Sequence, residues 1–145
     1  DLVHPVVSGG PFGFERVNVE SQWRQPGSLL DWTMRMIRMR KRCPAIGRGE
    51  WQILSTRNPH VIAMHYEWRG TRLVTVHNLS RRQATTKFQV PGSERVDLLD
   101  LLHDAAVPCA NDGRYEIALP AYGYCWFRVG SLGPAPRSPK PDEEP

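Results

Sequence analysis

The stretch NVESQWRQPGSLLDWTMRMIRMRKRC, residues 18–43, holds the only long helical pattern in the sequence. Ser28 follows a Pro-Gly pair and precedes Asp31 by three residues, a spacing typical of a capping box at the start of a helix. Cys43 precedes a proline, which cannot continue a helix, and basic residues crowd the turn before it, where the helix dipole favours cations. These residues therefore predict a helix over 29–42.

The predicted helix carries a wide apolar arc, because its apolar residues recur on one side at steps of about 100°. The arc consists of Leu29, Leu30, Trp32, Thr33, Met34, Met36, Ile37 and Met39. An arc this wide predicts that the helix lies on a large body. Arg40 falls in the middle of the arc, and we expect it to be partly buried beside a carboxylate or carbonyl group, since an unpaired buried charge is costly.

The composition is that of an ordinary soluble chain, with 40% apolar and 23% charged residues over 145 positions. No apolar run reaches the length of a membrane span or a signal-peptide core. The basic run RMIRMRKR lies opposite the apolar arc and has no aromatic or Gly-rich binding motif beside it, so it indicates a solvated helix face and no nucleic-acid partner. The chain begins at Asp1 in a loop pattern, so we expect a fragment of a longer protein.

The sequence contains none of the common catalytic or metal-binding motifs. Its three cysteines have no C-x-x-C spacing and its five histidines no ligand spacing, which predicts thiols in a reducing compartment and no metal or cofactor. The string LLHD at 101–104 places His103 next to Asp104, as in the pair that stabilises the transition state in some sugar-cleaving barrels. No acid or nucleophile motif accompanies it, so we interpret it as a strand end.

The rest of the chain predicts a mostly β fold. Turn residues separate seven short strand patterns, and the alternation within them favours an antiparallel sandwich or barrel. The predicted strands are 51–55, 61–68, 72–79, 85–90, 95–101, 115–119 and 124–129. From Ser131 the sequence SLGPAPRSPKPDEEP indicates a Pro-rich disordered tail or linker over 131–145.

Large aromatic residues are frequent in these strands. We expect Trp51, Trp68 and Trp126 to be core residues, because large aromatics are mostly buried. The alternative is a platform of exposed aromatics that stacks against sugar rings. Exposure distinguishes the two, since such a platform needs two or three coplanar aromatic rings facing solvent.

Four segments together resemble the C-terminal end of the α-amylase superfamily of glycoside hydrolases, and within it the trehalose synthases. They are PVVSGGPFGFERVNVESQWRQPGSLLDWTMRMIRMRKRCPAIGRGEW at 5–51, VIAMHYEWRG at 61–70, VTVHNLS at 74–80 and AYGYCWFRVG at 121–130. The resemblance implies that residues 1–45 are the last loop and eighth helix of a (β/α)8 catalytic barrel, and that 46–130 form the β-sandwich that follows it.

The resemblance also implies a cytoplasmic enzyme that interconverts maltose and trehalose by a retaining transfer of glucose. Its catalytic carboxylates would precede Asp1, so we expect no catalytic residue, no metal and no cofactor in this chain, which alone would be inactive. Phe12 and Phe14 would help to wall the substrate entrance, or else plug the space between loop and barrel.

The implied partner is the upstream barrel, and through it maltose or trehalose. A homo-oligomer and a downstream maltokinase domain are further partners that the resemblance allows. Two alternative functions also stay open: a carbohydrate-binding β-sandwich, and the C-terminal domain of another superfamily enzyme such as an α-glucosidase.

Overall fold

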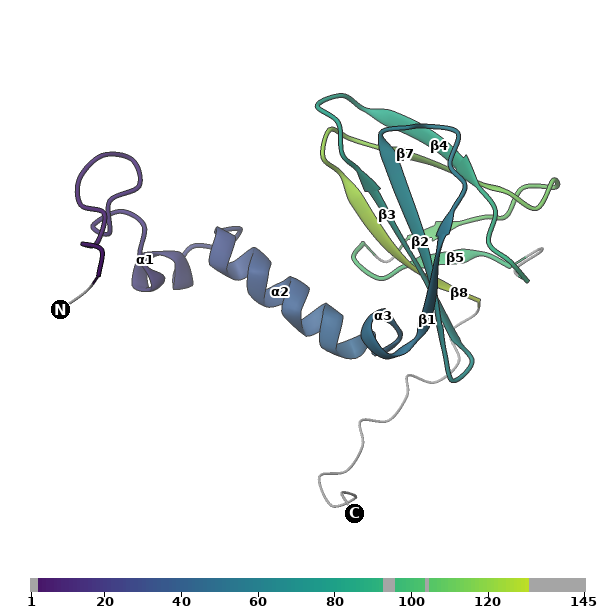
Figure 1. The fold of residues 1–145 in the computed structure, drawn as a ribbon, viewed down its shortest axis with the longest axis horizontal. Helices are drawn as coiled ribbons and strands as arrows, with labels where there is room; N and C mark the ends of the chain where they lie inside the picture. Colours follow the sequence, from purple (N-terminus) through teal and green to yellow (C-terminus); the bar gives the residue numbers. More distant parts are fainter. Residues whose placement is uncertain (1–2, 93–95, 104, 131–145) are drawn as a thin grey trace, which may run out of the picture. The chain divides into compact units, whose positions relative to one another are not determined.

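The computed structural model of the chain describes residues 3–92, 96–103 and 105–130 (Figure 1). The chain divides into two compact units, Asp1–Cys43 and Pro44–Pro145. The first is helical and the second is built mainly of antiparallel strands. The predicted tail over 131–145 lies outside the described residues.

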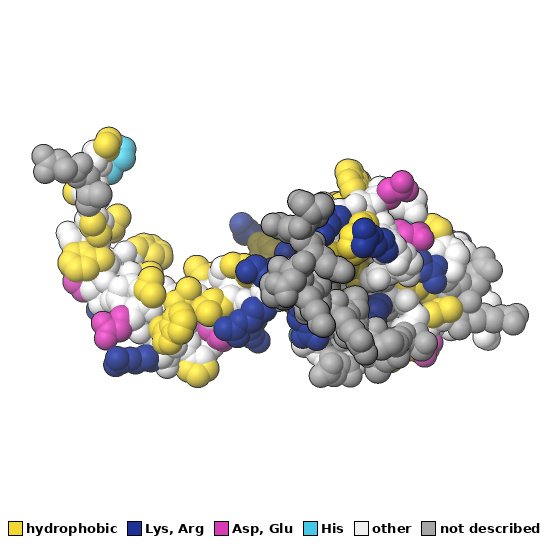
Figure 2. All heavy atoms as spheres, turned by 90° about the horizontal axis from the view of Figure 1, so that it is seen from below, with side chains coloured by type: hydrophobic (Ala, Val, Ile, Leu, Met, Phe, Trp, Pro, Cys, Tyr) yellow, Lys and Arg dark blue, Asp and Glu magenta, His cyan; other side chains and the backbone are white. Residues whose placement is uncertain are grey.

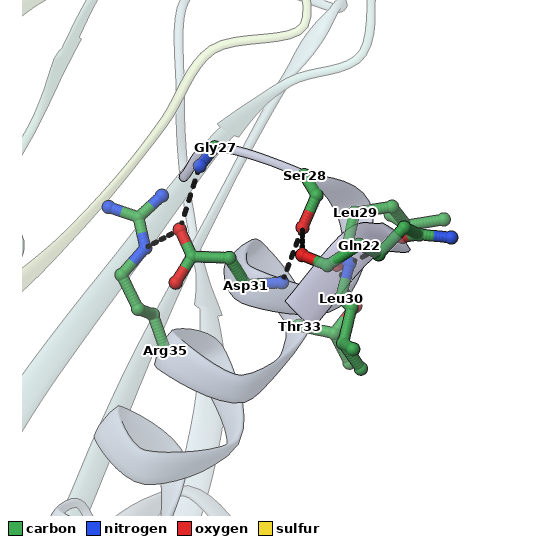
Figure 3. Close-up of polar contacts among 8 residues, drawn as sticks. All are labelled: Gln22, Gly27, Ser28, Leu29, Leu30, Asp31, Thr33 and Arg35. Carbon is green, nitrogen blue, oxygen red and sulfur yellow. Dashed lines mark hydrogen bonds and ion pairs between the residues drawn. The ribbon is translucent and has the colours of Figure 1, made fainter. Parts of the chain in front are cut away.

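The helical unit contains α1 (Val19–Trp23) and α2 (Leu29–Arg42), and α2 has the predicted bounds. Ser28 Oγ accepts a hydrogen bond from the Asp31 amide at 3.2 Å, as expected for an N-cap. The Asp31 carboxylate does not complete a standard capping box; it accepts the Gly27 amide at 3.0 Å and lies 3.8 Å from Arg35 (Figure 3). Gln22 supplies a second cap, because its Oε1 accepts the Leu30 amide at 2.9 Å.

The second unit begins with the short helix α3 (Ala45–Arg48) and continues with eight strands. These are β1 (Glu50–Leu54), β2 (Val61–Trp68), β3 (Thr71–Asn78), β4 (Ala84–Phe88), β5 (Leu98–Asp100), β6 (Ala106–Val107), β7 (Tyr115–Leu119) and β8 (Tyr124–Val129). Six of the seven predicted strands are confirmed with shifts of at most two residues at their ends. The predicted strand over 95–101 is shorter, since β5 has three residues and residue 95 lies outside the described residues, and β6 was not predicted. A two-residue strand shows no period in the sequence, so only its pairing with β5 reveals it.

The strands form two sheets. The large sheet has the order β1-β2-β3-β8-β5-β6, and the small sheet pairs β4 with β7. Every strand pair is antiparallel. One hydrophobic core joins the two sheets, and it contains Val74, Val76, Leu98 and Phe127 from the large sheet and Phe88, Tyr115, Ile117 and Leu119 from the small one. The predicted antiparallel sandwich is therefore confirmed.

The inward face of the large sheet is its less bulky one. In β2 the buried residues are Val61, Ala63 and His65, whereas the larger alternate residues from Ile62 to Trp68 are only half-buried on the opposite face. Small residues suffice inside because Phe88 and Tyr115 of the small sheet fill the space between the sheets.

The expectation that the tryptophans are core residues was wrong for Trp51, which is 62% exposed. It lies directly opposite Tyr66 in the β1–β2 register and so shares the outward face of the large sheet. Trp68 and Trp126 are half-buried, and neither belongs to the central cluster. The bulkier apolar residues of these strands face away from the core. The sequence alone could not show which face of each strand is the buried one.

Asn78 joins three segments of the sandwich. Its side chain is buried, and its Nδ2 donates to the carbonyls of Arg82 and Pro120, both at 2.7 Å. Its Oδ1 accepts hydrogen bonds from the amide of Ser80 at 3.0 Å and from its hydroxyl at 2.8 Å. One amide group thereby holds the end of β3, the β3–β4 connection and the segment between β7 and β8.

Candidate functional site

The loop that carries Phe12 and Phe14 is closed by its own hydrogen bonds. The amide of Phe14 donates to the Val7 carbonyl at 2.9 Å, and the Glu15 carboxylate accepts the Gly9 amide at 3.2 Å. The buried Gly13 lies where the loop crosses itself, and an added Cβ there would be 2.6 Å from the backbone nitrogen of Gly9. A glycine at position 13 therefore allows the crossing.

The two phenylalanines project from this closed loop. Phe12 is 79% exposed and Phe14 is 51% exposed. Exposed phenylalanine side chains on an ordered loop present apolar surface that a second body can cover. Their predicted role at a substrate entrance stays a prediction, as does the plug alternative.

Arg40 is exposed in this chain, and no ion pair to it occurs among the residues that the structure describes. Neither α1 nor α2 contains a buried residue, so the apolar arc around Arg40 is also accessible. Figure 2 shows exposed hydrophobic side chains along the helical unit. The predicted partner of Arg40 therefore stays a prediction about the body that covers this helix.

The histidine of the LLHD string pairs with a different carboxylate from the one considered in the sequence. Nδ1 of His103 lies 2.9 Å from Oδ2 of Asp100, while Asp104 lies outside the described residues. Asp100 is 8% exposed, and its Oδ1 also accepts the Leu102 amide at 2.8 Å. The arrangement closes the turn after β5, which agrees with the interpretation of this string as a strand end.

The nearby thiol is not activated. Burial and the negative charge of Asp100 raise the pKa of Cys125 to about 11, so the thiol stays protonated at neutral pH and is a poor nucleophile. Within the described ranges, no group of three or more His, Cys, Asp or Glu side chains is arranged to hold a metal ion. No helix in the described part of the chain is long and apolar enough to span a membrane.

The outward face of β1 and β2 exposes large apolar side chains. Trp51 and Ile53 are both 62% exposed, and across the register they face Tyr66 and Met64. Trp51, Met64 and Tyr66 line a hollow of about 300 Å3 together with Ile46, Gly47 and Gly49. The sequence did not single out this surface, and Trp51 was expected to lie in the core.

The same face does not form a sugar-stacking platform. The guanidinium carbon of Arg69 lies 4.7 Å from the centroid of the Trp68 ring, and that of Arg48 lies 5.9 Å from it. Both guanidinium groups therefore make cation–π contacts with this ring. Among the described aromatics of the sandwich, the strongly exposed ones are Trp51 in β1 and Tyr122, which precedes β8. In the large sheet β2 and β3 separate β1 from β8, which Tyr122 precedes, so the two rings do not make a continuous row.

Comparisons with known proteins support the fold and the resemblance. Residues 70–128 match the family described as "Sucrose hydrolase-like, C-terminal domain". The trehalose synthase of Thermus thermophilus is 32% identical over 147 residues, covering 99% of this chain and 15% of that protein. The trehalose synthase of Pimelobacter sp. (strain R48) is 31% identical over 129 residues, covering 86% of this chain and 22% of that protein.

The same fold occurs in a solved α-amylase. The crystal structure of an Anoxybacillus α-amylase superposes with a TM-score of 0.66 at 17% identity, over 88% of this chain and 27% of that one. The chain thus spans a quarter or less of the length of the trehalose synthases it matches. By these comparisons the chain is similar to the trehalose synthases over nearly its whole length, and its fold is that of the matching part of the α-amylase.

Proposed function

We propose that the chain is the C-terminal part of a trehalose synthase, which interconverts maltose and trehalose by intramolecular transglucosylation. The observation that carries the proposal is the 32% identity to the Thermus thermophilus trehalose synthase across 99% of the chain. A likeness that runs through loop, helix and sandwich alike is better explained by a shared enzyme than by a shared β domain.

In this proposal, residues 1–45 complete a (β/α)8 barrel as its last loop and eighth helix, and residues 46–130 form a sandwich that covers the barrel. The exposed apolar arc of α2 supports it, because a helix of the outer ring of a barrel must bury such an arc against the strands. Phe12 and Phe14 contribute to the substrate entrance, and Arg40 meets a buried carboxylate or carbonyl of the barrel.

The reaction proposed for the complete enzyme is retaining. One carboxylate attacks the glucose carbon, a second protonates the leaving oxygen, and the glucose is returned to the other hexose in a new linkage. The chain has no role in these bond changes. The protonated thiol of Cys125 and the Asp100–His103 turn offer no nucleophile or acid pair, in keeping with an inactive isolated chain.

The cellular setting is part of the same proposal. We place the enzyme in the cytoplasm, with the barrel as the main partner of this chain and with a homo-oligomer and a downstream maltokinase as further partners. The second candidate function, a carbohydrate-binding module, is disfavoured by the cations that occupy the Trp68 ring.

The test is conversion of maltose to trehalose by the chain alone, by the upstream barrel segment alone, and by the two mixed. Activity only in the mixture supports the proposal. Activity of the chain alone would show a catalytic site in the sandwich and overturn it. A mixture that hydrolyses maltose without forming trehalose would point instead to an α-glucosidase.

A further inference from the structure

We propose that β1 joins two copies of the protein, by pairing antiparallel with β1 of the second copy around a two-fold axis at Gln52. The two large sheets then form one continuous sheet. This inference deepens the proposed function, which includes a homo-oligomer, because it names the strand by which the copies meet.

Strand β1 is an open edge of the large sheet. It pairs with β2 on one side and has no strand on the other. Residues 50–53 are all exposed, and among the described elements β1 packs substantially against β2 alone. Natural edge strands avoid pairing with another chain through bulges, lysine, proline or short length. The β1 strand contains no lysine or proline and follows β2 without a bulge over five residues, whereas β6 at the opposite edge has only two.

The outward backbone groups of β1 belong to Trp51 and Ile53. The Leu79 amide donates to the His60 carbonyl at 2.8 Å in continuation of the β2–β3 register, so the even-numbered residues of β2 bond to β3. Successive residues of a strand direct their backbone groups to opposite neighbours. The odd-numbered residues of β2 therefore bond to β1, where they stand opposite Glu50, Gln52 and Leu54. The amide and carbonyl groups of Trp51 and Ile53 thus point away from β2, to the open edge.

A two-fold axis at Gln52 makes this edge self-complementary. It places Trp51 of each copy opposite Ile53 of the other, and both members of each pair have outward backbone groups. Such a pair exchanges both of its N–H···O bonds. It also brings an aromatic ring against a β-branched side chain, a favourable cross-strand pair. An axis at Trp51 would instead put Ile53 against Gly49, and an axis at Ile53 would put Trp51 against Ser55.

The side chains favour a second copy as the occupant of this edge. Trp51 and Ile53 are each 62% exposed, and the pairing covers both. Glu50 is the charged residue of β1, and it stands opposite the apolar Leu54 of the other copy and not opposite its own equivalent. The two Gln52 side chains meet at the axis, where each amide group can both donate and accept a hydrogen bond. The edge therefore matches itself in backbone groups, apolar side chains and charge.

The test is a disulfide at the axis, in the complete protein that contains this chain. Opposite residues without mutual backbone hydrogen bonds have Cα atoms about 4.5 Å apart, which lies within the range of about 4.4–6.8 Å that a disulfide needs. We expect Gln52→Cys to give a covalent dimer in oxidised glutathione, with a peptide linked from 52 to 52 in mass spectra.

Glu50→Cys is the matched control. Residue 50 is also exposed and lies on the same side of the strand as residue 52. The two copies of residue 50 would lie about 14 Å apart along the paired strands, too far for a disulfide. We expect at least about tenfold less linked dimer from Glu50→Cys than from Gln52→Cys. Equal yields from the two variants, or no linked dimer from either, would overturn the proposal.

Maltose conversion by the unsubstituted protein is measured separately. A dimer linked at position 52 in a protein that makes no trehalose would refute the proposed function and leave this inference standing. Conversion of maltose by a protein that stays monomeric in sedimentation would refute this inference and leave the proposed function standing.

A second measurement needs no substitution. Hydrogen exchange of the complete protein, resolved by residue, compares the amides of Trp51 and Ile53 with the Gln52 amide, which bonds to β2. On dilution until sedimentation shows monomer, the amides at 51 and 53 should exchange at least about tenfold faster, while the amide at 52 stays protected. Protection at 51 and 53 that persists in the monomer would assign this edge to another segment of the same chain and overturn the proposal. Fast exchange at 51 and 53 at every concentration would also overturn it.

Discussion

Replacing Asn78 by alanine tests whether one buried amide group holds the sandwich together. The substitution removes two hydrogen bonds donated to carbonyl groups at 2.7 Å and one accepted from the Ser80 amide. The single hydrogen of the Ser80 hydroxyl, which reaches Asn78 Oδ1 at 2.8 Å and the Arg82 carbonyl at 3.0 Å, then donates to the carbonyl. A net hydrogen bond contributes about 1 kcal/mol, and buried groups left without a partner add to the loss. Because alanine offers no replacement partner at a site only 2% exposed, we expect a loss of about 3 to 4 kcal/mol in the free energy of unfolding.

The assay is urea unfolding followed by tryptophan fluorescence, with the midpoint and the slope fitted together. The slope should stay unchanged, because the same surface is exposed on unfolding. Asn58→Ala is the matched control, since Asn58 makes two longer bonds, to the Thr85 carbonyl at 3.2 Å and from the His60 amide at 3.0 Å. A loss for Asn78→Ala no greater than for Asn58→Ala would refute the reasoning.

Three further predictions follow from the geometry. Burial lowers the pKa of His65 below its ordinary value of 6.5, so the unfolded chain binds the proton more tightly; stability is then full above 6.5 and falls as the pH drops below it. His65→Gln should lessen this acid loss in thermal melts, and an unchanged pH profile would count against it. Gly13→Ala should open the N-terminal loop, because the new Cβ would meet the Gly9 backbone at 2.6 and 2.7 Å; hydrogen exchange at the Phe14 amide should accelerate, and retained protection would disprove the crossing. Arg40→Leu should cost the full-length enzyme a few kcal/mol by leaving a buried partner unpaired, and should leave the isolated chain unchanged; equal melting shifts in both proteins would remove the case for a buried partner.

The helical unit shows how far local residues carry a prediction. Ser28 and the proline after Cys43 predicted both ends of α2 correctly, because caps and breakers act within a few residues of the helix ends. The second cap was not predicted. Gln22 reaches the Leu30 amide from the preceding helix, and only the path of the intervening turn brings them together.

The candidate sites also contain features that local sequence predicts and features that it does not. Spacing alone shows that the sequence lacks the common catalytic and metal-binding motifs, and the expectation of no catalytic residue stays a prediction. The partner of His103 could not be predicted from spacing, since Asp100 reaches it across the turn after β5. The outward face of β1 and β2 could not be predicted either, because a strand sequence with apolar residues on both sides does not show which side meets the second sheet.

The sequence by itself determined the bounds of α2, the places of seven strands among the described residues, their antiparallel class and the resemblance to a family, whereas α1, α3 and β6 were not predicted. The predicted features depend on period, caps and turn residues, which are local properties. Only the tertiary structure decided that Trp51 faces outward, that Asn78 links three segments and that α3 packs against β2 and β3. Such decisions depend on which surfaces meet across long sequence separations, and the period of a strand does not tell which distant segment covers each of its faces.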